Sequence, residues 1–374
     1  MANDFIRSLP SHDRRVTVSF LQRIHIDATL LILLLLLVAY GLVVLYSAVG
    51  RSEALFESQL VRMGLAFVAL FVAAQLPPQM YLRWAPLVYV VGVGLLAMVL
   101  VIGVTVKGSQ RWLDVGVTRF QPSELMKIAV PMAVAWYFHD KRLPPSFKDI
   151  LVVLAIILVP AGLIVVQPDL GTAILVSCAG FAVLLLAGLQ WRWIMIAAAG
   201  LAAAAPMLWF TLQEYQQRRI LTLFDPESDP LGAGWNIIQS TTAIGSGGWF
   251  GKGLFEGTQS HLDFLPEART DFIIAVIGEE LGFVGVLILL LLYLLVLGRG
   301  LYLATMCEST FGRLFSGALI VTFFVYVFVN IAMVSGLLPV VGVPLPLISY
   351  GGTSAITLLA SFGIVMAIRT HKAW

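Results

Sequence analysis

Long apolar runs separated by short polar stretches fill most of the 374-residue chain. Several runs reach the roughly 20 residues that an α-helix needs to cross a bilayer. Scanning with a window of about that length predicts about ten spans, and an even number places both ends of the chain on one side of the membrane. The expected spans are 27–48, 57–76, 81–104, 122–138, 149–166, 170–188, 193–212, 272–297, 314–335 and 347–368.

This pattern predicts an all-α polytopic membrane protein. We expect an arm over residues 1–26, a single membrane domain over 27–368 and a tail over 369–374. A transmembrane β-barrel would need alternating segments of about ten residues, which the sequence lacks. The loop 213–271, between spans 7 and 8, is much longer than most connections, so we expect it to be functional and to contain short helices.

Composition supports the membrane assignment: 59% of residues are hydrophobic and 12% are charged, against about 25% charged in an average soluble domain. The net charge of +2 gives no reason to expect nucleic acid as a partner. Lysine and arginine collect in the arm, in the loop 139–145, at Arg299 and Arg313, and in the tail. The positive-inside rule places that side in the cytoplasm, so the loops 107–114 and 213–271 face outward.

Acidic residues gather in the segment His261–Glu280, beside a long apolar run. Placing acids next to lipid is costly unless they line a wet cavity or bind a ligand. Thr270 is a suitable N-cap, which would put Asp271 in the first turn of a helix. Its carboxylate then either complements the helix dipole or serves as a general base. Glu279 and Glu280 follow two turns later, and three acids on one span predict a polar cavity.

Two other spans also open with acids. Glu124 and Lys127 are three residues apart, so they share a helix face and are expected to pair. The pair either braces the span or holds reacting groups in place. Asp169 follows Pro168 at the start of a further span, where it is either a cap-like acid or an active-site acid.

Cations in the outward loops accompany a glycine-rich stretch, Gly245–Gly253. Backbone N–H groups and guanidinium groups together suit phosphate oxygens, so a pyrophosphate ligand is one interpretation, and solvated or lipid-bound arginines are the other. The stretch does not match the P-loop pattern, and no zinc-binding or serine-nucleophile motif is present. The cations are Arg111, Arg218, Arg219, Lys252 and Arg269.

Prolines and glycines interrupt the chain over Pro339–Ser354, just before the last span. Non-helical backbone at membrane depth is tolerated only where it is buried in protein or faces water. The segment is therefore either a packing kink or part of a cavity wall.

Seven segments, in chain order, resemble the SEDS family (shape, elongation, division and sporulation), and most closely its rod-shape branch. The resemblance covers nearly the whole chain. The segments are Lys107–Leu113, Phe120–Lys127, Gln167–Thr172, Tyr215–Ile220, Asp225–Gly234, Phe264–Phe272 and Val343–Gly352.

The resemblance implies a peptidoglycan glycosyltransferase that polymerises lipid II into β-1,4 glycan strands at the outer face of the bacterial cytoplasmic membrane, for cell elongation and rod shape. It implies an inverting reaction with Asp271 as the catalytic base. The residues that it places in substrate binding are Arg111, Glu124, Lys127, Asp169 and Arg219.

The resemblance also implies ligands and partners. The ligands are lipid II and the nascent glycan strand, and the partners are a class B penicillin-binding protein, which is a transpeptidase, and other membrane proteins of the elongation complex. No dedicated metal site is expected from the sequence, although a divalent cation (Mg or Mn) at the substrate pyrophosphate is chemically reasonable.

Two other functions would use the same membrane fold. A lipid II flippase should bind its cargo near the bilayer midplane, whereas the charges in this sequence cluster at the outer ends of spans and Asn330 is one of few mid-span polar residues. A non-catalytic scaffold for the transpeptidase would need no reactive carboxylate. Replacing Asp271 separates the three functions, because it would stop polymerisation, stop translocation or stop neither.

Overall fold

A computed structural model of the protein describes residues 24–50, 52–106, 109–114, 116, 119–229, 232–261 and 267–371. Most of the expected arm 1–26 and the end of the tail 369–374 lie outside the described residues. The side chains at positions 106, 208, 215, 233, 260 and 261 are not described either.

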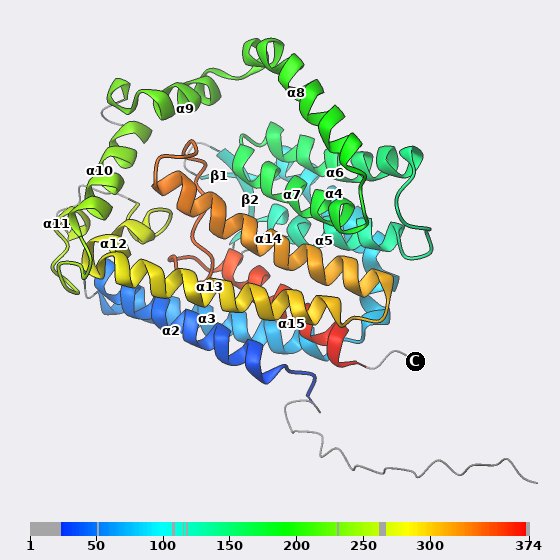
Figure 1. Cartoon of the computed structure of the whole chain (residues 1–374), viewed down its shortest axis with the longest axis horizontal. Helices are drawn as coiled ribbons and strands as arrows, with labels where there is room; N and C mark the ends of the chain where they lie inside the picture. Colours follow the sequence, from blue (N-terminus) through cyan, green and yellow to red (C-terminus); the bar gives the residue numbers. More distant parts are fainter. Residues whose placement is uncertain are drawn as a thin grey trace, which may run out of the picture.

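Each of the ten expected spans coincides with helical structure, and all of these helices except α8 (Trp191–Thr211) pack side by side into one bundle (Figure 1). Among the described residues, seven helices are long and apolar enough to cross a membrane: α2 (Ala28–Ala48), α3 (Glu53–Gln75), α4 (Pro78–Ile102), α6 (Phe147–Val166), α13 (Gly282–Thr305), α14 (Thr310–Val334) and α15 (Thr353–Thr370). The other expected spans are α5 (Pro122–Tyr137), α7 (Leu170–Leu186) and α8 (Trp191–Thr211). The prediction of an all-α polytopic membrane protein is confirmed.

Local sequence explains where several helices begin. The Asp27 carboxylate accepts a backbone N–H from the first turn of α2 at 2.8 Å. Pro78 and Pro122 open α4 and α5, where the missing proline N–H is not needed. Ser146 and Asp149 form a capping box at the start of α6, so each satisfies a backbone N–H of the other.

The expected span 272–297 is two helices, α12 (Ile273–Glu280) and α13, because the chain bends between them. Gly282 at the bend has φ of +65°, which glycine adopts without strain. Two N–H groups of the glycine-rich stretch Gly245–Gly253 donate to the last two carbonyls of α12, at 3.0 Å each. They satisfy acceptors that the helix end leaves open, so the loop supports the bend.

The expected span 347–368 begins only at Thr353, the first residue of α15. The chain is non-helical from 335 to 352, with positive φ at Gly336, Gly342 and Leu347. This agrees with the proline- and glycine-rich pattern of Pro339–Ser354. We call residues 335–352 the re-entrant segment.

A small antiparallel sheet follows α4, which the sequence analysis did not predict. Its strands are β1 (Val104–Val106), β2 (Ser109–Asp114) and β3 (Arg119–Phe120), in the order β1-β2-β3. Leu113 pairs with Phe120 across β2 and β3. The sheet fixes the chain between α4 and α5 and thereby places the side chain of Arg111.

The large loop contains short helices, as predicted: α9 (Glu214–Phe224), η1 (Pro226–Ser228), α10 (Ala233–Ser246) and α11 (Thr258–His261). In Figure 1, α8 and α9 form an arch that stands away from the other helices. None of the described side chains of α8 is buried. The apolar surface of α8 is therefore free to face lipid or another protein.

The two described ends of the chain meet at one end of the bundle. The rings of His25 and His371 stack with centroids 3.5 Å apart. Arg299 of α13 donates to both carboxylate oxygens of Asp27, at 3.0 and 2.7 Å. An even number of spans predicts that both ends lie on one side of the membrane, which agrees with these contacts.

Candidate active site

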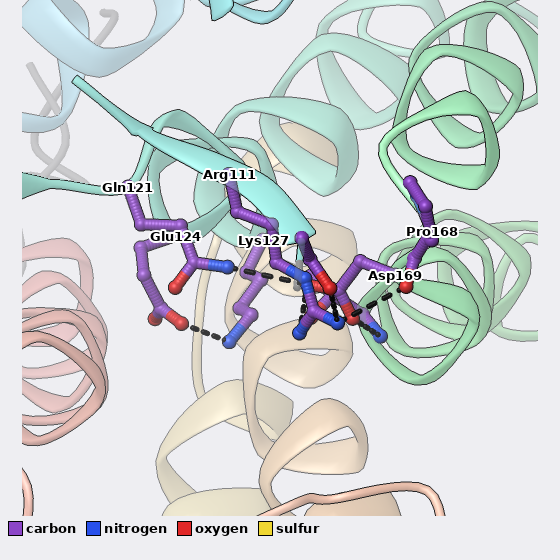
Figure 2. A network of polar contacts seen from close by, with 8 residues as sticks. Arg111, Gln121, Glu124, Lys127, Pro168 and Asp169 are labelled. Carbon is purple, nitrogen blue, oxygen red and sulfur yellow. Dashed lines mark hydrogen bonds and ion pairs between the residues drawn. The ribbon is translucent and has the colours of Figure 1, made fainter. Parts of the chain in front are cut away.

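Arg111, on β2, forms an ion pair with Asp169, which precedes α7, at an N–O distance of 3.4 Å (Figure 2). Its guanidinium group also donates to the Ser109 hydroxyl at 2.7 Å and to the Pro168 carbonyl at 3.0 Å. The Arg111 side chain is 31% exposed, whereas that of Asp169 is 8% exposed. Arg111 is thus held by three partners and still presents part of its charge, as binding of an anionic ligand requires.

Asp169 caps a helix, which is one of the two roles that the sequence left open, and it also joins a network of polar side chains. One carboxylate oxygen accepts the backbone N–H of Thr172 at 3.2 Å, which caps α7. The other accepts from the Gln121 amide at 3.3 Å and pairs with Arg111. The start of α5, the start of α7 and strand β2 therefore meet at this carboxylate (Figure 2).

Glu124 and Lys127 pair as expected, with 2.5 Å between Nζ and Oε1 and side chains that are each 9% exposed. The Thr357 hydroxyl of α15 donates to the second carboxylate oxygen at 2.9 Å. The ammonium group lies 4.8 Å from the centre of the Tyr326 ring of α14. The pair joins α5 to α14 and α15, which is compatible with both a brace and a positioning group.

Asp271 lies in the turn before α12, not in its first helical turn. The helix begins at Ile273, and the Thr270 hydroxyl donates to the Glu267 carboxylate at 2.7 Å instead of capping. The predicted N-cap is therefore wrong. Backbone N–H groups of Thr270 and Phe272 both donate to the Glu267 carbonyl, at 3.1 and 3.2 Å, so the turn is closed on itself. Asp271 is half-buried.

One face of α14 joins the Lys127 region to Asp271. Tyr326 lies under Lys127, and Asn330, four residues later, donates to the Asp271 carbonyl at 2.7 Å. Residues four apart on a helix are neighbours on one face. The two groups of polar residues thus lie one helical turn apart.

The re-entrant segment makes a second connection, because α7 packs closely against it. A Cβ added at Gly171 would lie 2.8 Å from the Val341 carbonyl oxygen. A Cβ added at the next residue, Gly342, would lie 3.6 Å from the Asp271 carboxylate. The segment therefore runs between the start of α7 and Asp271.

Glu279 and Glu280 do not share a cavity with Asp271, so that prediction is wrong. Their residues are 0% and 1% exposed. Glu279 pairs with Lys252 at 2.8 Å, and Ser47 of α2 donates to Glu280 at 2.8 Å. They fix the large loop to the bundle, because an acid at this depth needs such partners.

The remaining cations of the outward loops do not gather around Arg111. Lys252 is held by Glu279, which argues against the glycine-rich stretch as a phosphate site. Arg218 pairs with Glu214 on the exposed surface of α9. Arg219 is also on α9, which is part of the arch (Figure 1), whereas exposed Arg269 lies in the same turn as Asp271. The structure thus brings together Arg111, Glu124, Lys127, Asp169 and Asp271 around α14 and places the helix of Arg219 outside this group.

Sequence reasoning missed the neutral residues that hold this site. Gln121, Thr357 and Asn330 each contact one of the predicted charged residues. Asn330 stood out only as a polar residue within an apolar run. That signal identifies a residue that needs a buried partner, but it does not say which partner.

One cavity lies outside the site. A cavity of about 290 Å³ is lined by His139, Cys307, Arg369 and His371, among others, at the end of the bundle where the two described chain ends meet. Within the described ranges, no three His, Cys, Asp or Glu side chains gather as metal ligands.

The fold and the site define a polytopic helical membrane protein in which a half-buried carboxylate lies beside a network of ion-paired cations. The family model for FtsW, RodA and SpoVE, described as cell cycle protein, matches residues 27–373. The chain belongs to this family.

Curated relatives match almost the whole chain. "Peptidoglycan glycosyltransferase MrdB" of Escherichia coli K12 is 52% identical over 95% of this chain and 96% of its own length. "Probable peptidoglycan glycosyltransferase FtsW" of Trichlorobacter lovleyi is 37% identical over 91% of this chain and 92% of its own length.

Solved structures show the same fold. A chain from a study of how a peptidoglycan synthase complex coordinates polymerization and crosslinking matches with a TM-score of 0.81 and 33% identity, covering 92% of this chain and 97% of that one. The rod shape determining protein RodA of Thermus thermophilus matches with a TM-score of 0.70 and 31% identity, covering 92% and 96%.

Proposed function

We propose that this protein is a peptidoglycan glycosyltransferase that polymerises lipid II into β-1,4 glycan strands for cell elongation and rod shape. The observation that carries the proposal is 52% identity, over 95% of the chain, to a protein named peptidoglycan glycosyltransferase. A solved chain from a peptidoglycan synthase complex has the same fold over 92% of this chain.

Asp271 is the proposed general base. Its carboxylate takes the proton from the 4-hydroxyl of the acceptor GlcNAc, and that oxygen bonds to the anomeric carbon of the donor MurNAc. The bond from this carbon to the undecaprenyl pyrophosphate breaks, and the pyrophosphate leaves with the bonding electrons. Attack opposite the α-linked leaving group gives a β bond, so the reaction inverts. A half-buried carboxylate on a closed turn suits this proton transfer.

The cations have the complementary role. Negative charge grows on the pyrophosphate as it leaves, and fixed cations stabilise that charge. Arg111 is the best-placed candidate in the network, because Asp169 orients it while 31% of its side chain is exposed. Lys127 is oriented by Glu124 but is more deeply buried. Arg219 requires the arch to approach the site, so its role depends on a movement of α9.

A divalent cation at the pyrophosphate stays a prediction from the substrate chemistry. The carboxylates of Asp169 and Glu124 are engaged with Arg111 and Lys127, and no three His, Cys, Asp or Glu side chains gather as metal ligands among the described residues. If bound, the ion would neutralise pyrophosphate charge, and none of the steps above depends on it.

Lipid II, the nascent strand, a class B penicillin-binding protein and other elongation-complex membrane proteins are the proposed ligands and partners. The match to a chain of a synthase complex supports the transpeptidase partner. We assign both termini to the cytoplasm and the site to the outer face. The meeting of the two chain ends and the position of the arginine-rich loops support this orientation.

A lipid II flippase is the alternative. Proteoliposomes that contain the protein, its transpeptidase partner and fluorescent lipid II distinguish the two functions. Glycan strands on a gel support polymerisation. Accelerated movement of lipid II between leaflets without strands would support the flippase and overturn the proposal.

A further inference from the structure

Three consecutive carbonyl groups at and before Asp271 each accept a hydrogen bond from α14 or the re-entrant segment. The turn that carries the carboxylate is therefore fixed from outside as well as by its own bonds to Glu267. The pairs are Tyr350 N with Arg269 O (2.8 Å), Ser349 Oγ with Thr270 O (2.5 Å) and Asn330 Nδ2 with Asp271 O (2.7 Å).

Asn330 is the centre of this arrangement. It is 0% exposed, and its amide nitrogen donates to the Asp271 carbonyl and to the Val343 carbonyl, each at 2.7 Å. A primary amide has two N–H groups, and both partners are acceptors, so the orientation of the amide is determined. One side chain thus links the Asp271 turn to the re-entrant segment.

The same segment also approaches the carboxylate. Gly342 precedes Val343, and a Cβ added there would lie 3.6 Å from Asp271 Oδ2. Gln59 of α3 anchors the far part of the segment by accepting the Gly351 N–H at 3.2 Å. The position of the carboxylate therefore depends on how the segment is held.

The hydrogen bonds of Asn330 come from its amide nitrogen. Its amide oxygen is buried and accepts no hydrogen bond from any described residue. What the side chain supplies at this position is therefore the pair of N–H groups that links the Asp271 turn to the re-entrant segment.

We propose that Asn330 is a positioning residue for glycosyl transfer, which holds the Asp271 carboxylate at the reacting centre through the backbone. The inference rests on the proposed function, in which Asp271 is the base. Displacing a reacting group by about 1 Å can cost about 100-fold in rate. Asn330→Ala should therefore lower kcat by about 10- to 100-fold, with KM changed little.

Steady-state polymerisation of lipid II, with the transpeptidase partner present, tests this. Rates are expressed per folded protein and measured well below the melting temperature. The acid side of the pH profile should not shift, because Asn330 touches the backbone and not the carboxylate. Thr322→Ala is the matched control, since Thr322 is also buried in α14 but its hydroxyl bonds within the helix, to the Ala318 carbonyl. It should leave kcat unchanged.

A double-variant comparison separates positioning from a general structural effect. Asp271→Glu keeps a carboxylate but moves it, so in that background Asn330→Ala should lower kcat by less than about threefold. If Asn330→Ala does not fold, Ser349→Ala removes the neighbouring bond to Thr270 and should give the same non-additive loss.

The outcomes distinguish this proposal from the function on which it rests. If Asp271→Asn polymerises normally, the role of Asp271 fails and the positioning role fails with it. If Asp271→Asn is inactive while Asn330→Ala, or Ser349→Ala in its place, keeps the wild-type kcat, only positioning is overturned. A loss that adds in full to that of Asp271→Glu also overturns it.

Discussion

Removing one charge of the Glu124–Lys127 pair should destabilise the protein far more than removing both. At 2.5 Å and an effective dielectric constant of about 20, the attraction is about 7 kcal/mol, most of which is offset by the several kcal/mol needed to desolvate each ion. Glu124→Gln or Lys127→Met alone leaves one buried charge without its counter-ion, at an expected cost of about 3–5 kcal/mol. The double variant buries no charge and should lie within about 1 kcal/mol of wild type.

Unfolding of the purified variants in detergent, followed by tryptophan fluorescence, measures these differences. The exposed pair Arg218–Glu214 is the control: its N–O distance is 2.7 Å, but its side chains are 74% and 80% exposed. Single variants of that pair should cost at most about 1 kcal/mol. The reasoning is refuted if the buried single variants behave like this control, or if the double variant is as unstable as either single variant.

The stable double variant also resolves the two interpretations of the pair. A brace has no part in the reaction, so the variant without both charges would still polymerise lipid II. A positioning role for Lys127 predicts a folded but inactive variant.

Three further predictions concern separate regions. Arg111→Lys should lower kcat/KM for lipid II by about tenfold or more, because an ammonium group cannot reproduce the planar contacts with Asp169 and its neighbours; polymerisation kinetics measure it. Glu279→Ala should lower the free energy of unfolding by about 3–5 kcal/mol, because it leaves the partners of a fully buried carboxylate unpaired; thermal unfolding measures it. Burial and, to a lesser extent, the charge of His371 lower the pKa of His25 from 6.5. The unfolded state then binds a proton first as the pH falls, so stability should be constant above pH 6.5 and decrease below it until the lower pKa of the folded state is reached.

For each of these predictions, a specific result would contradict the reasoning. Wild-type kinetics for Arg111→Lys would show that the guanidinium geometry is not needed, and Arg192→Lys, at an exposed arginine of α8, is the control. An unchanged melting temperature for Glu279→Ala would remove its role in anchoring the loop. A melting temperature that does not depend on pH below 6.5, or one that depends on it equally after His25→Gln, would rule out the histidine.

The bundle could be predicted from the sequence because each span is a long apolar run. The breaks within these apolar runs could not be predicted, because averaging the hydropathy over about 20 residues hides a single bend. Gly282 turns the chain between α12 and α13 within one apolar run, and the glycine-rich stretch that supports the bend lies about 30 residues earlier. The strands before α5 were also missed, since they are only three, six and two residues long.

The charged residues of the site could be found because charge is rare in this chain. Their partners could not be predicted, apart from the i,i+3 pair of Glu124 and Lys127. Contacts between residues that are far apart in the sequence have no characteristic spacing. Arg111 and Asp169 are brought together by the packing of β2 against the start of α7. Thr270 was misread for a related reason: its hydroxyl donates to the Glu267 carboxylate, and α12 begins only at Ile273, so Thr270 does not cap the helix.

Lipid II polymerisation by the Asp271→Asn variant tests the central claim most directly. Wild type and variant are purified with the transpeptidase partner, matched for melting temperature and given the same lipid II, and their glycan strands are separated on a gel. Loss of a general base should reduce the rate by about 10²–10⁴-fold, so strands are expected from wild type and almost none from the variant. Equal amounts of strand from both would contradict the role of Asp271 and transfer attention to Asp169 and Glu124.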